Sequence, residues 1–377
     1  MARDPLPLAQ ALIRCASVTP ADDGALAVVE AALRPLGFAV THLDFDGTPN
    51  LFAIRTTPGT NGPHLCFAGH TDVVPPGAGP WTVEPFGGEV RDGILYGRGA
   101  TDMKGGVAAF IAAIPEASPG TISLLITGDE EGPATGGTVR VLEWMQAQGH
   151  IPDMCLVGEP TSKVALGDTI KVGRRGSLNA TITVHGTQGH SAYPQRADNP
   201  IHRLVRVLAT LTATPLDTGS AFFEATSLQV TSVDVGNPAT NVIPGSATAR
   251  LNIRFNDLHS SASLGEHLRG VLAEHAPRHE LELSCSGESF LTRPGPFVEA
   301  LKRAVRAACG REPTLDTGGG TSDARFISRY CPVAELGAVG ATMHKADEQT
   351  PVAELRALTA LYAAVIAETL VLPGSGL

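Results

Sequence analysis

The first 160 residues alternate between segments with helical spacing and short runs of continuously apolar residues. Apolar side chains recur at helical spacing in four segments, 5–18, 25–37, 107–117 and 138–149. Short apolar runs stand between them at 51–57, 64–70, 121–128 and 153–159. Apolar runs that do not alternate with polar residues are typical of a parallel sheet covered by helices on both faces. This part of the chain therefore predicts an α/β fold with a mainly parallel sheet.

After about residue 175 the pattern changes. Apolar and polar residues alternate in three longer segments, 177–186, 226–236 and 247–256, and helical spacing returns at 199–211 and 263–275. Alternation indicates strands with one solvated face, so we expect a smaller α+β unit here. From about residue 290 the first pattern resumes, in segments 296–310, 331–337 and 353–370.

The simplest organisation is an interrupted domain. A chain of 377 residues is longer than one core usually serves, which favours two domains. We predict an α/β domain with helices covering a mainly parallel sheet, formed by residues 1–176 and 290–377. Residues 177–289 would form an inserted, smaller α+β domain.

Composition excludes several classes of protein. The chain is 43% hydrophobic and 18% charged, as in soluble globular proteins. Its net charge of −10 argues against nucleic-acid binding, which needs a basic face. No run reaches the about 18 apolar residues of a membrane span, and the N-terminus lacks a signal-like apolar core. Six cysteines, none in a CxxC pair, fit free thiols in a reducing compartment, so we expect a cytoplasmic protein.

Acidic and imidazole side chains stand at the ends of three predicted strands. The run at 64–70 is followed by Asp72 and itself ends in His70, the run at 121–128 leads to Glu130 and Glu131, and the run at 153–159 ends in Glu159. In open α/β sheets ligands bind outside the carboxyl ends of the strands. The three elements are therefore expected to direct these groups into one crevice.

Two further residues complete a candidate metal site. Asp102 stands before the helical segment at 107–117, and His344 follows another apolar run. Nitrogen and oxygen donors without cysteine suit a catalytic Zn²⁺ or Co²⁺ site. The candidates are too many for one open tetrahedral ion but suit two ions about 3.5–4 Å apart that share a carboxylate. One carboxylate of the Glu130–Glu131 pair would be a ligand and the other a general base.

Each residue also has an ordinary interpretation. His70 alone could be a core or surface histidine, Asp102 a helix N-cap, and the Glu130–Glu131 pair a solvated turn. The glycine-rich stretch GGGTSD, residues 318–323, could be a plain loop, and as a phosphate site it lacks the lysine of a P-loop. Together these interpretations leave several strand-end coincidences unexplained, and we favour the metal site. Asp129 is interpreted as a turn residue that closes the strand end.

The motifs GHTDVVP, GRGATDMKGG, TGDEEG, GEP and MHKADE, in this order, resemble those of the zinc aminoacylase and exopeptidase family. The resemblance covers essentially the whole chain. It implies two Zn²⁺ per subunit, with Co²⁺ as a possible substitute. One zinc would bind His70 and Glu159, the other Glu131 and His344, and Asp102 would bridge them.

The resemblance also implies the remaining catalytic parts. Glu130 takes the position of the general base, and Asp72 that of the residue that orients His70. The predicted domains become a catalytic domain split around a dimerisation domain, in a homodimer where His190 and Asn241 reach the partner subunit's site. A cis peptide bond is expected between Asp102 and Met103.

Within that family, GRRGS, GHSAYP, NPATNVIPG and GGGTSDARF favour a desuccinylating member over a deacetylating one. The substrate would be a small N-acyl amino acid with a carboxylate at each end. Candidate cationic partners, chosen because arginine binds carboxylates in bidentate fashion, are Lys171, Arg174, Arg175 and Arg254. Candidate hydrogen-bond partners are Ser177, Tyr193, Gly320 and Thr321. The alternatives are a deacetylase, aminoacylase or dipeptidase, or a non-catalytic protein that binds metal or peptide.

Overall fold

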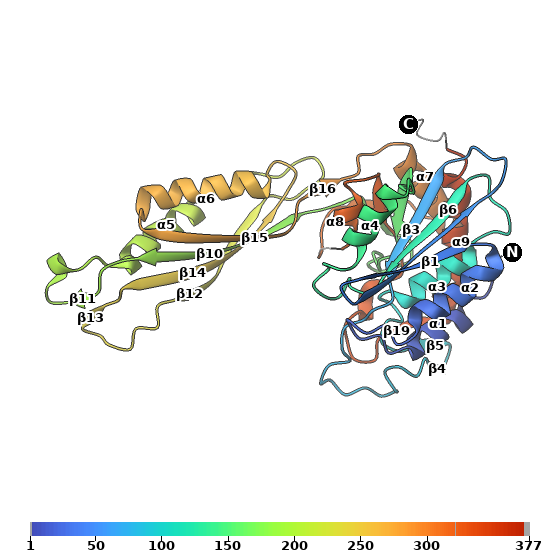
Figure 1. Ribbon diagram of the computed structural model, residues 1–377, viewed down its shortest axis with the longest axis horizontal. Coiled ribbons are helices and arrows are strands. Elements are labelled where there is room, and N and C mark those ends of the chain that lie inside the picture. The colour runs from blue at the N-terminus through green and yellow to red at the C-terminus, as the bar shows by residue number, and fades with distance from the viewer. Residues whose placement is uncertain (1, 321, 373–377) are drawn as a thin grey trace. The chain divides into compact units, whose positions relative to one another are not determined.

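A computed structural model describes residues 2–320 and 322–372 of the chain (Figure 1). The chain divides into two compact units. The first comprises Met1–Val172, Thr292–Asp316 and Ser322–Leu377, and the second comprises Gly173–Leu291 and Thr317–Thr321. None of the helices in the described residues is long and apolar enough to cross a membrane.

The first unit contains a large sheet and helices on both of its faces. Its helices are α1 (Leu6–Arg14), α2 (Ala25–Leu33), α3 (Lys104–Ala113), α4 (Thr138–Ala147), α7 (Pro296–Cys309), α8 (Ala324–Ile327) and α9 (Val352–Thr369). The strands of the large sheet are β1 (Ala39–Phe45), β2 (Thr48–Thr56), β3 (His64–His70), β6 (Thr121–Thr127), β7 (Met154–Val157), β8 (Thr169–Lys171), β17 (Thr314–Asp316) and β18 (Val333–Glu335). A small sheet holds β4 (Val90–Arg91), β5 (Ile94–Tyr96) and β19 (Gln349–Pro351).

The centre of the large sheet is parallel. The strand order is β1-β2-β6-β3-β7-β18-β8-β17, and β6, β3, β7 and β18 all run in the same direction. The antiparallel pairs lie towards the edges, where β2 pairs with β1 and β6, and β8 pairs with β18. The predicted mixed α/β fold with a mainly parallel central sheet is confirmed.

Strand register shows which helices cover which face. Phe67 of β3 stacks on Phe110 of α3, with ring centroids 4.1 Å apart, and also contacts Tyr362 of α9. Its neighbours across the sheet are Leu124 and then Ala53, so Phe52, one residue before Ala53, points to the opposite face. On that face Phe52 contacts Trp144 of α4. Helices α3 and α9 therefore cover one face and α4 the other.

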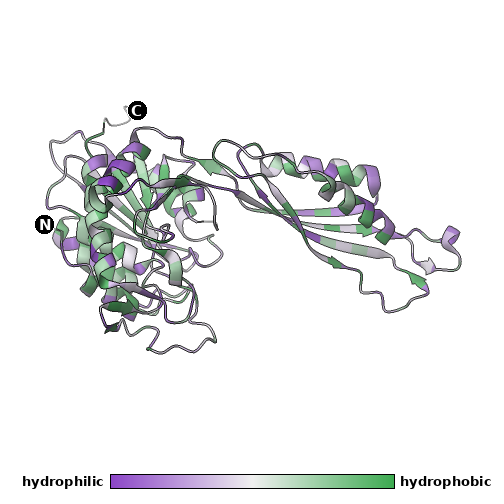
Figure 2. Cartoon of the chain, turned by 180° about the vertical axis from the view of Figure 1, so that it is seen from behind, coloured by the Kyte–Doolittle hydropathy of each residue, from purple (hydrophilic) through white to green (hydrophobic). Residues whose placement is uncertain are grey.

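The second unit is a four-stranded antiparallel sheet with two helices. Its elements are β9 (Gly173–Arg174), β10 (Gly176–His185), β11 (Gly189–His190), α5 (Pro200–Ala213), β12 (Ser227–Asp234), β13 (Val242–Ile243), β14 (Ser246–Phe255), α6 (Ser261–His275), β15 (His279–Gly287) and β16 (Phe290–Leu291). The main sheet has the order β12-β14-β10-β15. Its core joins alternate residues of β10 and β14 to the inner sides of α5 and α6. Figure 2 shows hydrophilic residues along the remaining sides of these helices.

Several short or edge strands were not predicted from the sequence, and β1 and β15 are the longest of them. β1 and β15 each pair with a single neighbour, and most of their residues remain exposed or half-buried. A strand with little buried surface carries a weak apolar pattern, which explains why the sequence gives no clear signal for either one.

Protonation of His64 is expected to destabilise the first unit. His64 begins β3, where its ring Nε2 lies 2.8 Å from Ser123 Oγ. Burial, with a smaller contribution from His150, lowers the pKa of His64 to about 4 against the opposing effect of Asp153. The unfolded chain therefore binds the proton more readily, and stability contributed by the neutral ring is lost as the pH falls from about 6.5 towards 4.

We expect the free energy of unfolding of the wild type to drop, relative to His64→Gln, by about 2 kcal/mol between pH 7 and pH 5. Urea unfolding of both proteins at the two pH values measures this difference. Because all other titrating groups are common to both proteins, parallel pH profiles would contradict the assignment.

Candidate metal centre

The candidate ligands gather where the parallel strands end. His70 is the last residue of β3, and β6 ends at Thr127, shortly before Glu130. β7 ends at Val157, shortly before Glu159. Because β6, β3 and β7 are parallel neighbours, their carboxyl ends lie along one edge of the sheet, the usual place for ligand sites in such folds.

Asp102 lies between two histidines. Its Oδ1 is 3.3 Å from His70 Nε2, and its Oδ2 is 3.3 Å from His344 Nε2. Glu159 Oε1 is 3.8 Å from the same Nε2 of His70. Glu131 Oε1 is 2.8 Å from the same Nε2 of His344. The five residues thus form two halves that share one carboxylate.

Two overlapping groups are compact enough to hold a cation. The first group consists of His70, Asp102 and Glu131, and the second of His70, Glu130 and Glu159. In each group, every residue offers one ligand atom, and these atoms lie within 4.8 Å of one another. Both groups contain His70, and the second includes Glu130.

The atoms of this cluster fit a divalent metal. His70 Nε2 and Asp102 Oδ1 are buried and have no hydrogen-bond partner within the described residues. A buried polar atom without a partner is costly, and a cation placed between these two donors would satisfy both. Imidazole and carboxylate donors without thiolate match Zn²⁺ or Co²⁺ rather than a soft metal.

The orientation of His70 is fixed by its other nitrogen. His70 Nδ1 lies 2.9 Å from the main-chain carbonyl oxygen of Asp72, which can only accept a hydrogen bond. When the ring is neutral, as a metal ligand must be, its proton therefore sits on Nδ1 and the lone pair of Nε2 faces the cluster. The Asp72 carboxylate is further away, with Oδ1 3.6 Å from Nδ1.

The Asp72 carboxylate instead holds the turn that follows β6. It accepts hydrogen bonds from the main-chain N–H groups of Glu130 and Glu131, at 3.3 and 3.1 Å, and from the Thr19 hydroxyl at 2.7 Å. One residue thus orients His70 through its carbonyl and anchors both glutamates through its side chain.

Asp129, the first carboxylate of the DEE run, is a structural residue. Its Oδ2 accepts hydrogen bonds from the N–H groups of Thr135 and Gly136, at 2.8 and 3.0 Å, and its side chain is buried. The interpretation of Asp129 as the residue that closes this strand end is confirmed.

Burial, reinforced by neighbouring carboxylates, raises the pKa values of two glutamates in the cluster. Burial, together with the nearby charges of Asp323, Glu131 and Asp102, raises the pKa of Glu130 to about 8 against the opposing effect of His70. Burial likewise raises the pKa of Glu159 well above its usual value. A cation bound among these carboxylates would relieve this repulsion.

The backbone around two of the candidates is unusual. The Asp102–Met103 peptide bond is cis, which confirms the expectation from the sequence motif. His344 has a φ of 61°, in the left-handed region that side chains other than glycine seldom adopt.

The predicted substrate-binding residues fall on both units. Lys171 belongs to the first unit, where its Nζ lies 3.1 Å from Asp316 Oδ2. The second unit contributes Arg174, Arg175, Ser177, His190, Tyr193, Asn241, Arg254 and Gly320. Thr321 lies outside the described residues.

Within the second unit these residues form two groups. At the start of β10, Ser177 is the cross-strand neighbour of Arg254, and Arg174 Nη1 donates a hydrogen bond of 2.7 Å to the carbonyl of Gly320. Arg175 Nη1 lies 3.7 Å from the carboxylate of Glu224.

The other group lies beyond the opposite end of β10, on the β11–β13 ribbon (Figure 1). Here the rings of His190 and Tyr193 are 5.7 Å apart, and Asn241 accepts a hydrogen bond from the N–H of Ser191. Because β10 spans Gly176–His185, the two groups are about 30 Å apart at the usual rise of a strand. One chain therefore cannot use both groups at a single small substrate.

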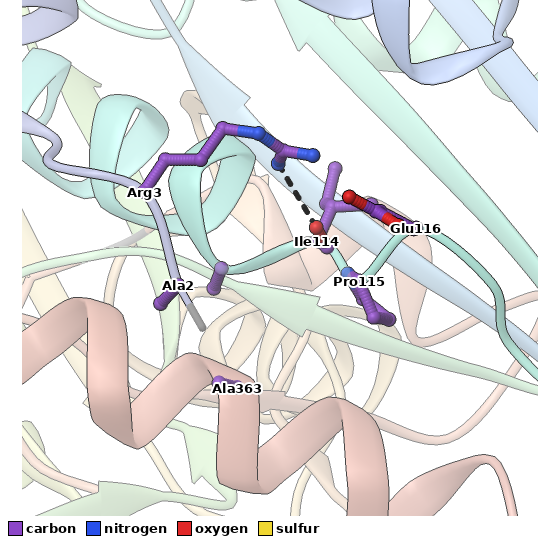
Figure 3. A pocket seen from close by; sticks show the side chains of 7 residues that line it. Ala2, Arg3, Ile114, Pro115, Glu116 and Ala363 are labelled. Atoms are coloured by element: carbon purple, nitrogen blue, oxygen red, sulfur yellow. Dashed lines mark hydrogen bonds between the residues drawn. The ribbon is translucent and has the colours of Figure 1, made fainter.

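Two cavities of the first unit differ in their relation to the cluster. A cavity of about 340 Å³ borders Glu131 and is lined by threonine and proline residues, among them Thr19, Pro20 and Pro133. A cavity of about 580 Å³ is lined by Arg3, Ile114, Pro115, Glu116 and alanine residues, and contains none of the candidate ligands (Figure 3). Figure 3 shows the Arg3 side chain donating a hydrogen bond to the main-chain carbonyl of Ile114.

Arg98 and Glu348, which are not among the residues predicted for the site, lie next to the candidate ligands. Their side chains form a buried ion pair, with Arg98 Nη1 2.7 Å from Glu348 Oε2. The sequence offers one signal for these two residues, which is their position within the motifs GRGATD and MHKADE. A charged residue that is buried beside a metal site needs a partner of opposite charge, so the two motifs could have been paired on this ground.

Comparison with known proteins gives close relatives along the whole chain. A succinyl-diaminopimelate desuccinylase of Gluconacetobacter diazotrophicus is 63% identical over 371 residues, covering 96% of each chain. One of Granulibacter bethesdensis is 59% identical over 373 residues, covering 96% of this chain and 97% of the relative.

Solved structures share the fold at low identity. The crystal structure of aminopeptidase PepT from Bacillus cereus has a TM-score of 0.78 at 22% identity, covering 97% of this chain and 98% of PepT. The YXEP protein of Bacillus subtilis, described as a dinuclear metal binding peptidase, has a TM-score of 0.70 at 16% identity and covers 97% of both chains.

The sequence profile of Peptidase family M20/M25/M40 matches residues 66–368, which include every candidate metal ligand. With this match and relatives of such high identity, the chain is a hydrolase that belongs to peptidase family M20/M25/M40.

Proposed function

We propose that the protein hydrolyses the amide bond of N-succinyl-L,L-2,6-diaminopimelate to succinate and L,L-diaminopimelate, a step of diaminopimelate and lysine biosynthesis. The names and high identity of the relatives support this substrate. The observation that carries the chemistry is the position of Asp102, whose two oxygens face His70 and His344 at equal distances of 3.3 Å. Because this is a biosynthetic role, we also propose a cytoplasmic location.

Two divalent ions, Zn²⁺ or Co²⁺, would be held by the residues of the cluster. His70 and Glu159 would bind one ion, Glu131 and His344 the other, and Asp102 both. Bound there, the ions would act as Lewis acids and lower the pKa of water. Asp72 supports the cluster from outside, by fixing the tautomer of His70 and the main chain of Glu131.

Glu130 is the proposed general base. In the ligand assignment above it binds neither ion, yet it has an oxygen within 4.8 Å of His70 and Glu159. Its main chain is held by the Asp72 carboxylate. Its side chain would accept a proton from the attacking water and return it to the leaving amine, so that the proton is conserved over the cycle.

The two substrate carboxylates need cationic partners in this acidic protein. Arg174, Arg175 and Arg254, with Lys171, are the proposed partners, because a guanidinium can bind a carboxylate with two parallel hydrogen bonds. Hydrogen bonds would come from Ser177, Tyr193, Asn241, Gly320 and Thr321.

We further propose a homodimer formed through the second unit, with catalysis assigned to the first. His190 and Asn241 lie at the opposite end of β10 from Ser177 and Arg254, about 30 Å away. The two groups could serve one site only if they come from different chains. His190 would then donate a hydrogen bond to the oxyanion formed in the partner subunit's site.

The general base can be tested by substitution. Glu130→Gln keeps the shape of the side chain but cannot accept a proton, so turnover should fall by about 10²–10⁴-fold. Metal content, measured by elemental analysis, should remain that of the wild type. Near-normal turnover of the variant would show that another group is the base.

The substrate can be tested by direct comparison. The metal-loaded protein should turn over N-succinyl-L,L-diaminopimelate with a higher kcat/KM than N-acetylornithine, another N-acylated amino acid or a dipeptide, and chelation should abolish the activity. Preference for one of the competitors would identify a deacetylase, aminoacylase or dipeptidase instead. Loss of all hydrolysis with metals loaded would indicate a non-catalytic metal- or peptide-binding protein.

The shared site can be tested by mixing two inactive variants. His190→Ala and Glu130→Gln each disable both sites of a homodimer. A mixed dimer contains one site with the intact Glu130 of one chain and the intact His190 of the other. Co-expression should therefore restore activity that neither variant shows alone, whereas no recovery in purified mixed dimers would place His190 outside the partner's site.

A further inference from the structure

The Arg98–Glu348 pair is buried beside the candidate metal ligands. The two side chains are 2% and 0% exposed, and Arg98 Nη1 lies 2.7 Å from Glu348 Oε2. Removing two charges from water is costly unless their remaining donors and acceptors are also satisfied. The other hydrogen-bond partners of Arg98 and Glu348 therefore indicate why these positions carry charged residues.

The Glu348 carboxylate organises the main chain that leads to Asp102. Oε1 accepts hydrogen bonds from the N–H groups of Thr101 and Asp102, at 2.9 and 3.0 Å. Oε2 accepts one from the N–H of Gly99 at 3.0 Å, in addition to that from Arg98. Four donors thus converge on one carboxylate, and one of them is the main chain of the proposed bridging ligand.

The Arg98 guanidinium connects the same turn to two other loops. Nη1 also donates to the carbonyl of Lys345, next to His344, at 3.2 Å. Nη2 donates to the carbonyls of Pro75 and Pro76, shortly after Asp72, at 3.3 Å each. Its planar face lies over the ring of Trp81, 5.2 Å from the centroid.

The loop that carries His344 requires such support. His344 and Asp347 both have positive φ, 61° and 52°, which costs energy for residues other than glycine. Such a conformation persists only where neighbouring contacts hold it. The contacts come from Arg98, which binds the Lys345 carbonyl, and from the Thr82 N–H, which donates to the Asp347 carboxylate at 2.7 Å.

We propose that Arg98 and Glu348 are positioning residues that fix Asp102 and His344 relative to each other before metal binds. Neither residue is a candidate ligand, and the pair would act on the site through the main chain that it binds. It joins the turn of Asp102, the loop of His344 and the segment that follows His70 and Asp72 into one rigid support. The inference rests on the ligand assignment of the proposed function.

Glu348→Gln tests the role with little change in shape. An amide has one accepting oxygen and one donating nitrogen, so at least two of the four donors around Glu348 would face an N–H₂ group. After chelation of the full-length protein and reloading with Co²⁺, we expect about 10–100-fold weaker binding by calorimetric titration. The visible absorption bands of the bound Co²⁺, which report its coordination geometry, should also change.

Arg98→Lys provides a second variant that keeps the buried positive charge. Lysine lacks the planar fork that reaches three loops, so this variant should also bind Co²⁺ more weakly and with an altered spectrum. If Glu348→Gln does not fold, Arg98→Lys alone decides the question.

Asp168→Asn is the matched control. The Asp168 carboxylate likewise accepts three main-chain N–H groups, from Lys163, Val164 and Ala165, but it supports a loop that carries no candidate ligand. This variant should bind Co²⁺ with wild-type affinity and spectrum.

Two results would overturn the positioning role alone. One is wild-type affinity and spectrum in both Arg98→Lys and folded Glu348→Gln. The other is an equal loss in the Asp168→Asn control, which would show a general loosening of the fold. If the wild-type protein itself bound no Co²⁺, the ligand assignment and the positioning role would fall together.

Discussion

Parallel pairing of β6, β3 and β7 is the constraint on which the candidate site depends. Each strand is buried on both faces, between α3 and α9 on one side and α4 on the other, so none can shift without exposing apolar surface. Parallel strands end at the same edge. The residues that follow them, His70, Glu130 and Glu159, are thereby brought together although 89 positions separate the first from the last.

This arrangement buries several carboxylates close together, and hydrogen bonds from the surrounding main chain offset part of the energetic cost. Carboxylates held close together and away from water repel one another, and burial raises the pKa values of Glu130 and Glu159. Main-chain N–H groups offset part of this cost at the carboxylates outside the cluster, where Asp72, Asp129 and Glu348 each accept at least two. These residues hold the turns in place while the inner carboxylates are left to bind a cation.

In the second unit, the length of the sheet limits which residues can act on the same substrate. A sheet built on ten-residue strands separates its two ends by more than any small substrate can span. Polar residues of the two ends can then act on one substrate only in an assembly of chains. This separation is the reason for proposing a homodimer, in which GHSAYP, beyond the far end of β10, and GRRGS, at its start, would serve one site from different chains.

The sequence alone determined the α/β pattern, the parallel sheet centre and the residue types at the strand ends, because periodicity and motifs are local properties. Among the strands that it missed are β1 and β15, whose side chains are too little buried to leave an apolar pattern. Only the tertiary structure showed that the carbonyl of Asp72 orients His70, or that Arg98 meets Glu348 across 250 residues. Such contacts depend on which atoms the folded backbone brings within hydrogen-bonding distance, and no local pattern in the chain encodes that.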